Sequence, residues 1–153
     1  MPDSDSDSSA AAQPPLRLTI ELVPATSWGA NVRDMLPREA WDRLRRQVYA
    51  ASQHHCAICG AAGRLHCHEL WDYDDARHIQ SLRGLVALCA LCHAVKHIGH
   101  TRLLADQGQL DYERVVAHFL RVNSCDRATF ERHRAAAFAR FEQRSRYEWQ
   151  LDV

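Results

Sequence analysis

Two pairs of closely spaced cysteines constrain the fold of this chain more than any other feature. The first pair is Cys56 and Cys59, and the second is Cys89 and Cys92. A C-x2-C pair bends the backbone so that two thiolates face one ion, and two such pairs complete a tetrahedral zinc site. Chance rarely gives two such pairs in a short chain, and neither pair lies in the strand–helix–strand context of a redox motif. The sequence therefore predicts a structural Zn²⁺ ion that ties the intervening segment together.

Histidines surround the same cysteines and predict a second metal site. His93 directly follows the second pair and His97 lies four residues later, so on a helix both imidazoles share one face. His66 and His68 share one face of a strand, with Cys67 on the other. Imidazoles and a thiolate gathered in this way are typical ligands of a divalent metal.

The order of these motifs resembles that of the HNH endonucleases, whose ββα-metal unit is held together by a zinc ion. The resemblance covers residues 54–100: a cysteine pair, a strand ending in a histidine motif, then GLVALCALCH and Lys96-His97. Residues 71–75 and the C-terminal RSRYEWQLDV also resemble bacterial HNH-annotated proteins of unassigned role. The resemblance implies a treble-clef-like, zinc-clipped unit with a metal-dependent nuclease activity.

The resemblance also implies roles for individual residues. His68 matches the general base that takes a proton from the attacking water, and Cys67 matches the metal ligand that precedes it. His93 and His97 match the metal ligands of the helix. The implied reaction is metal-assisted hydrolysis of a phosphodiester bond, with the ion held by Cys67, His93 and His97.

Two departures from the family pattern affect this expectation. Cys67 is a softer ligand than the usual Asp or His and favours zinc, among Zn²⁺, Ni²⁺, Mn²⁺ and Mg²⁺, as the second metal. Gly84 stands where the family has the asparagine that orients the base. We expect Glu69, His66 or a water molecule to take that role, and Glu69 is the second predicted catalytic residue.

The expected partner is a nucleic acid, with DNA preferred. Lys+Arg and Asp+Glu number 19 each, so the chain has no broad basic surface and must bind phosphates locally. Lys96 and Arg83 lie close to the motif and are the candidate phosphate contacts. The sequence leaves the oligomeric state open.

Two other functions compete with the nuclease. A zinc module that keeps only nucleic-acid or protein contacts agrees with Gly84 and would bind one metal instead of two. A nucleobase deaminase would hold zinc with Cys67, Cys89 and Cys92 and shuttle protons with Glu69. The deaminase pattern leaves the first cysteine pair unexplained and has Leu88 where proline is usual, so it ranks below the nuclease.

The remaining sequence predicts an α+β, mostly helical fold. Residues 1–15 form an acidic low-complexity tail, which we expect to be disordered, and 16–153 form one domain. Helices are expected over 37–52, 111–122 and 127–145, the last two within a C-terminal helical region, 111–145. Strands are expected at 17–23 and 147–153, which would allow the two ends to pair. The absence of a long apolar run or a signal sequence predicts a cytoplasmic protein that is not inserted in a membrane.

Overall fold

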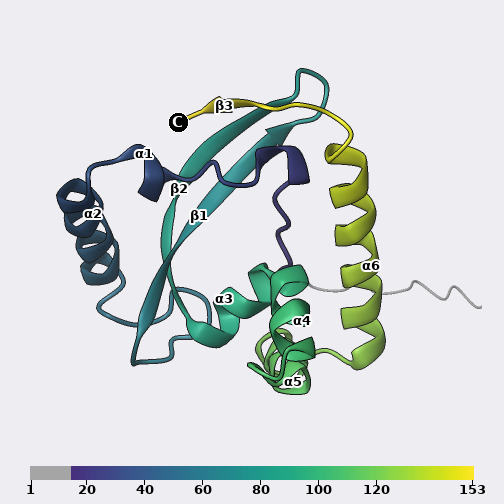
Figure 1. Ribbon diagram of the computed structural model, residues 1–153. Coiled ribbons are helices and arrows are strands. Elements are labelled where there is room, and N and C mark those ends of the chain that lie inside the picture. The colour runs from purple at the N-terminus through teal and green to yellow at the C-terminus, as the bar shows by residue number, and fades with distance from the viewer. Residues whose placement is uncertain (1–14) are drawn as a thin grey trace, which may run out of the picture.

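A long β-hairpin forms the centre of the structure, and helices are arranged around it (Figure 1). The computed structural model describes residues 15–153. Strands β1 (Leu65–Asp74) and β2 (Ile79–Cys89) pair antiparallel, with one irregularity between Leu70 and Trp71. The short strand β3 (Gln150–Asp152) pairs with the start of β2, so the sheet order is β1-β2-β3.

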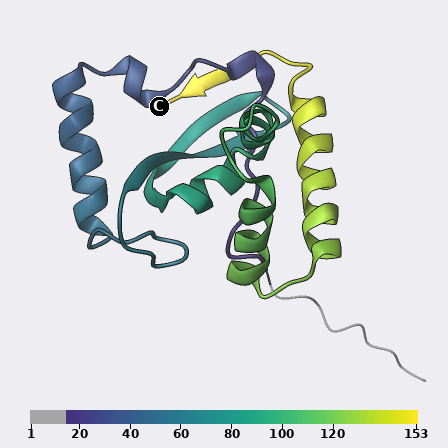
Figure 2. The same cartoon turned by 60° about the horizontal axis from the view of Figure 1, so that its bottom comes forward.

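Six α-helices and a 3-10 turn complete the described part of the chain. They are η1 (Ala25–Ser27), α1 (Val32–Met35), α2 (Arg38–Ala51), α3 (Ala90–Lys96), α4 (Ile98–Asp106), α5 (Tyr112–Asn123) and α6 (Arg127–Arg144). Helix α2 lies on one side of the hairpin and α6 on the other, while α3, α4 and α5 gather at its open end (Figures 1 and 2). The predicted α+β class is confirmed.

The long helices lie where the sequence predicts them. Helices α2, α5 and α6 each begin and end within one residue of the predicted bounds. Asp111 accepts hydrogen bonds from the first amides of α5, and Asp126 accepts one from the Thr129 amide in α6. Because both helices start at a side-chain cap, their N-termini are readable from the sequence.

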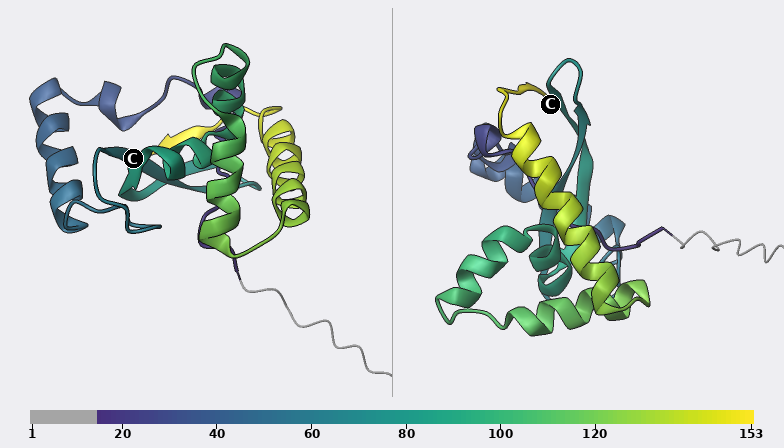
Figure 3. Two further views of the ribbon diagram at one scale, coloured as in Figure 1. Left: turned by 90° about the horizontal axis from the view of Figure 1, so that it is seen from below. Right: turned by 90° about the vertical axis from the view of Figure 1, so that its right-hand side faces the viewer.

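The core forms where α3, α4, α5 and α6 meet the open end of the hairpin. Its fully buried side chains include Leu18, Leu88, Val95, Ile98, Val115, Val116, Phe119 and Phe130. The rings of Phe119 and Phe130 pack edge to face with centroids 5.1 Å apart, which joins α5 to α6. Helix α6 then runs beside the hairpin up to its tip (Figure 3).

The predicted strand at 17–23 is wrong, although the alternation of apolar and polar residues does indicate which side chains are buried. Leu18 and Ile20 are buried, as a period of two requires, but the segment forms no strand. Side chains satisfy its backbone instead, because Asn123 accepts from the Leu18 amide and His133 accepts from the Ile20 amide. The segment is therefore an extended arm held by helices α5 and α6.

The expected pairing of the two ends is also wrong, because residues 17–23 form no strand with which the C-terminus could pair. The C-terminal strand exists, but it is shorter than predicted and pairs parallel with Ile79–Ser81 of β2. Arg144, at the end of α6, binds the Asp75 carboxylate in the hairpin turn at 2.8 Å and 3.0 Å. The C-terminus is thus attached to the tip of the hairpin. Most of the predicted disordered tail, residues 1–14, lies outside the described residues.

Candidate metal centres

The four paired cysteines meet at the open end of the hairpin and form the four-cysteine site. Cys56 and Cys59 precede β1, Cys89 ends β2, and Cys92 lies in α3. Their sulfur atoms all lie within 4.8 Å of one another, and those of Cys59 and Cys89 are 3.6 Å apart. Thiolates at roughly 2.3 Å from a tetrahedral zinc ion would be roughly 3.8 Å apart. The predicted cluster is confirmed as a group that could hold one zinc ion.

Local backbone geometry builds each half of this site. Gly60 has a φ of +77°, and its amide donates to the Cys56 carbonyl at 2.9 Å, which closes the first turn. A positive φ is easy for glycine and strained for other residues. In the second half, the Cys92 amide donates to the Cys89 sulfur at 3.4 Å. The spacing of two residues within each pair is what allows both turns.

The electrostatics of the four thiols favour a cation. Burial raises the pKa of Cys92, and repulsion by neighbouring thiolates raises it further. Burial is also the main cause that raises the pKa of Cys89. Burial alone would raise the pKa of Cys56, but backbone hydrogen bonds from Cys59 and Cys89 outweigh it and lower the pKa to about 7. The thiolates of Cys89 and Cys92 therefore need a positive charge beside them, and four soft sulfur ligands fit zinc.

A buried histidine supports the four-cysteine site from α5. His118 Nε2 lies 3.1 Å from the Cys92 sulfur, and Arg121 donates to His118 Nδ1 at 2.9 Å. Because a guanidinium can only donate, Nδ1 must accept and Nε2 must carry the proton that points at the sulfur. The chain from Arg121 through His118 thus supplies a fixed hydrogen bond to one thiolate.

Three imidazoles form a second group, the histidine cluster, apart from the four cysteines. His68 projects from β1, His93 from α3, and His97 lies at the junction of α3 and α4. One ring nitrogen of each lies within 4.8 Å of the others, so the three could share one ion. The ring centroids are 4.7 Å to 5.5 Å apart. The ring of His66 stacks on that of His93 at 4.9 Å and adds a fourth imidazole beside the cluster.

Burial keeps His93 and His97 in the neutral form that binds metals. It lowers the pKa of His93 to about 3, with a further contribution from the neighbouring His97 and His68. It lowers the pKa of His97 to about 4, again with help from His68. Both imidazoles are therefore uncharged near pH 7, and each has one ring nitrogen with a lone pair that can bind a metal.

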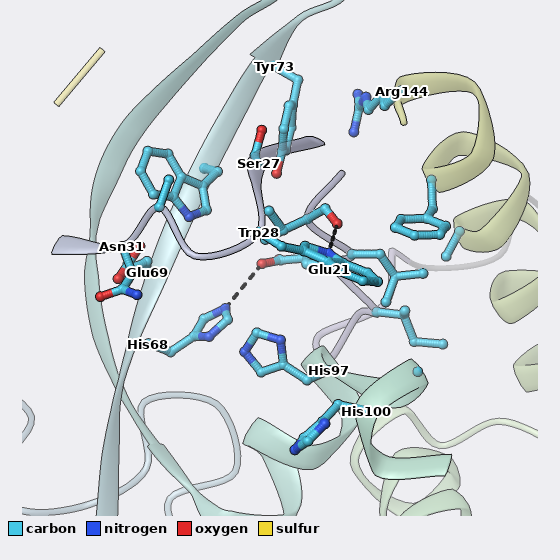
Figure 4. A pocket seen from close by; sticks show the side chains of 18 of the residues that line it. Glu21, Ser27, Trp28, Asn31, His68, Glu69, Tyr73, His97, His100 and Arg144 are labelled. Atoms are coloured by element: carbon cyan, nitrogen blue, oxygen red, sulfur yellow. Dashed lines mark hydrogen bonds and ion pairs between the residues drawn. The ribbon is translucent and has the colours of Figure 1, made fainter. Parts of the chain in front are cut away.

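The buried Nε2 atom of His68 supplies the test of whether a metal fits. His68 is 4% exposed, and among the described residues its Nε2 has no hydrogen-bond partner. A buried polar atom left in this way costs about 1–3 kcal/mol. Glu21 Oε2 lies 3.5 Å from this nitrogen, at ion-pair distance but too far for a good hydrogen bond (Figure 4). A dication among the imidazoles would satisfy both the orphaned nitrogen and the carboxylate.

Glu21 is the site residue that sequence reasoning missed. Its Oε1 accepts from Lys96 Nζ at 2.8 Å, and Lys96 also donates to Thr19 at 3.1 Å. Burial alone would raise the pKa of Glu21, but the contacts with His68 and Lys96 outweigh it and lower the pKa to about 2. A lone acid in an alternating segment gives no signal of this role, because its partners lie far away in the sequence.

The same contacts correct the prediction for Lys96. The side chain is 4% exposed and its ammonium is held by Glu21, so it does not face a phosphate. Its place beside the motif predicts a phosphate contact, but the burial of the ammonium excludes that contact. Its role is instead to fix the carboxylate that faces His68.

The structure also corrects the predicted ligand Cys67. It belongs to neither metal group of the described residues, and His68 takes its place beside His93 and His97. Neighbouring strand residues project to opposite faces, so Cys67 and Glu69 cannot join a cluster that His68 joins. Glu69 accepts a hydrogen bond from the Val32 amide at 3.0 Å, which holds α1 against β1. The histidine cluster therefore contains neither Cys67 nor Glu69.

Two further predicted positions lie on β2. Arg83 is 55% exposed and its guanidinium lies 3.9 Å from Asp72, so it remains accessible to a ligand. Gly84 pairs with Leu70 across the hairpin, and a side chain there would meet open space. The glycine cannot orient His68, and Glu21 lies beside that imidazole instead.

A cavity of about 950 Å³ opens beside the histidine cluster. His68, His93 and His97 line it together with Glu21, and aromatic and arginine side chains complete its wall. The N-terminal arm crosses the cavity between the hairpin and α6, which brings Glu21 and Trp28 into it (Figure 4). The cluster is thus open to a ligand, whereas the four-cysteine site serves to join chain segments.

The comparisons with known proteins found no matching family model, no matching curated protein and no matching solved structure. Assignment of this chain therefore depends on its own residues and their geometry. Within residues 15–153, none of the helices combines the length and the apolar character that crossing a bilayer would require.

Replacing Glu21 with alanine is expected to lower the free energy of unfolding by about 2 kcal/mol, because it leaves the buried Lys96 ammonium without its counter-ion. This is less than for a fully buried pair, since the Glu21 side chain is 37% exposed. Urea denaturation of the metal-loaded protein measures the change. Glu113→Ala is the control, because its ion pair with Arg127 is exposed and should contribute less than about 1 kcal/mol. Equal losses in both variants would contradict a supporting role for Glu21.

Proposed function

We propose that this protein is a metal-dependent endonuclease of the HNH type, which hydrolyses phosphodiester bonds of nucleic acids at the histidine cluster. The four-cysteine site would be its structural zinc clip, in a treble-clef-like arrangement. Strand β1, strand β2 and helix α3 follow one another as the strands and helix of a ββα-metal unit do. This order supports the resemblance drawn from the motifs.

One observation carries the proposal: three imidazoles, one buried and two half-buried, converge beside an open cavity. Structural zinc sites are usually closed by four protein ligands, whereas catalytic sites have three and keep a position for water or substrate. The histidine cluster has the second composition. The chain thus carries one candidate site of each kind.

Each residue of the site has a distinct role in the proposed reaction. His68, His93 and His97 would hold the ion, which supplies Lewis-acid stabilisation of the developing phosphate charge and lowers the pKa of a bound water. The Glu21 carboxylate places a negative charge beside His68, and the Lys96 ammonium holds that carboxylate in place. Arg83 and Arg140 line the cavity and attract a polyanion. In this proposal the ligand role belongs to His68 instead of Cys67, so His68 is not the general base.

The two competing functions fare differently. A deaminase would need Cys67, Cys89 and Cys92 around one ion, but the last two belong to the four-cysteine site and Cys67 does not. The three cysteines that the deaminase alternative requires are therefore not grouped around one position. A non-catalytic zinc module agrees with Gly84 and is distinguished from the nuclease by metal content and activity.

The test is to count metals and measure cleavage on the same preparation. We expect two metal ions per chain by elemental analysis, and cleavage of a labelled nucleic acid when Zn²⁺, Ni²⁺, Mn²⁺ or Mg²⁺ is supplied. One zinc per chain, with no cleavage in any of these metals, would exclude the nuclease and favour the binding module.

A further inference from the structure

Trp28 is a large apolar side chain that the fold leaves open in the cavity. It is 69% exposed, yet it is held firmly, because its indole Nε1 donates to the Val23 carbonyl at 3.0 Å. One face stacks on Phe141 of α6, with ring centroids 6.0 Å apart and planes inclined by 18°. Figure 4 shows Trp28 in the same cavity as His68 and His97. The ring is thus fixed in orientation beside the histidine cluster and still accessible.

From this geometry we infer that the substrate is single-stranded nucleic acid, and that Trp28 stacks on one of its unpaired bases. The inference rests on the proposed function and specifies the substrate of the same site. Aromatic rings that bind single strands offer a flat surface to any base, because every base has a π-face. A rigid indole needs little ordering on binding, so stacking on it is favourable.

Arg140 supplies the charge that such a strand requires. It projects from α6, is exposed and lines the cavity, and no hydrogen bond or ion pair engages it in residues 15–153. Arg144, one turn later, is instead bound by Asp75 and lies over the Tyr73 ring at 4.2 Å. Of these two arginines of α6, Arg140 is therefore the one free to contact a phosphate.

The placement of Trp28 favours a single strand over a duplex. Bases inside a duplex are paired and stacked on one another, and a base must be flipped out before a side chain in a cavity can stack on it. Bases of a single strand have exposed faces and incur little of this cost. An aromatic ring inside the cavity, next to the cluster that would act on the phosphate, therefore suits an unpaired nucleotide.

Fluorescence anisotropy tests the inference with the metal-loaded protein and labelled phosphorothioate strands of about ten nucleotides, in DNA and RNA forms. The single strand is expected to bind roughly ten-fold more tightly than its duplex. Trp28→Ala should weaken single-strand binding roughly ten-fold, and Trp28→Phe should restore most of it. Arg140→Ala should reduce the slope of log K against log salt by about 0.7.

Two exposed residues outside the cavity give matched controls. Tyr147→Ala removes an exposed aromatic ring, and Arg132→Ala removes an exposed arginine from the same helix as Arg140. Both variants should bind the single strand as the unmodified protein does. Duplex binding as tight as single-strand binding, or unchanged single-strand binding by Trp28→Ala, would overturn the inference.

The two proposals fail in different ways. Selective, Trp28-dependent binding without cleavage in any metal would support single-strand recognition and reject the nuclease. Metal-dependent cleavage of duplex and single strand alike, unaffected by Trp28→Ala, would support the nuclease and reject single-strand recognition.

Discussion

If the proposed function holds, replacing His93 with alanine is expected to remove one metal ion per chain and to slow the proposed phosphodiester cleavage roughly a thousand-fold. His93 forms one corner of the histidine cluster, with ring centroids 5.5 Å from His68 and 4.7 Å from His97. Two imidazoles would remain, and they are a poor site for an ion that needs three fixed ligands. A catalytic metal contributes several kcal/mol to transition-state stabilisation, and about 4 kcal/mol corresponds to roughly a thousand-fold in rate.

The measurement combines elemental analysis with initial rates of cleavage. Zinc in the four-cysteine site should be retained, because His93 is not one of its sulfur ligands. His55→Ala is the matched control, since it removes an exposed imidazole that belongs to neither group. A His93→Ala protein with two metals and undiminished cleavage would place the chemistry elsewhere.

Local spacing explains why much of both centres could be read from the sequence. A C-x2-C pair forms its turn within a few residues, as the bonds around Gly60 and Cys92 show. The pair His93 and His97 shares one face because a helical turn spans nearly four residues. In each case the chain geometry that brings the ligands together is a property of a short segment.

The choice between His68 and Cys67 could not be made in this way. A strand alternates between two faces, and the period alone does not say which face meets α3. The family resemblance placed the ligand at residue 67, but the register of β1 turns residue 68 toward the helix. One position along a strand reverses the direction of the side chain, so a small error in alignment changes the ligand set.

Contacts between distant segments were beyond sequence reasoning altogether. Glu21 meets His68 and Lys96 because the N-terminal arm lies against the hairpin and α3. The arm is held there by side chains of α5 and α6, such as Asn123 and His133, rather than by a sheet. No local pattern encodes these contacts, and the alternation of the arm suggested a strand instead.

Replacing Cys92 with alanine is expected to have the larger effect, with loss of the structural zinc and unfolding of the hairpin's open end. Cys92 is fully buried at 0% exposure, and its sulfur receives the hydrogen bond from His118. Structural zinc contributes about 10 kcal/mol of apparent binding energy, which is comparable to the whole stability of a small domain. Zinc analysis, solubility and hydrogen exchange of residues 54–64 measure the outcome.

Cys125→Ala is the matched control for this variant. Cys125 is the free cysteine on the turn between α5 and α6, and it belongs to neither metal group of the described residues. Its replacement should retain zinc and lower stability by about 1 kcal/mol or less. A soluble, fully folded Cys92→Ala protein without zinc would show that the four-cysteine site is not needed for the fold.

The two variants together test whether the histidine cluster needs the four-cysteine site for its assembly. The four-cysteine site joins the segment before β1 to the end of β2 and the start of α3, and His68 lies in β1 and His93 in α3. Loss of Cys92 should therefore remove both metals, whereas loss of His93 should remove one. If Cys92→Ala retained an ion in the histidine cluster, the packing of the hairpin against α3 would suffice to hold the imidazoles, and zinc would not be what assembles them.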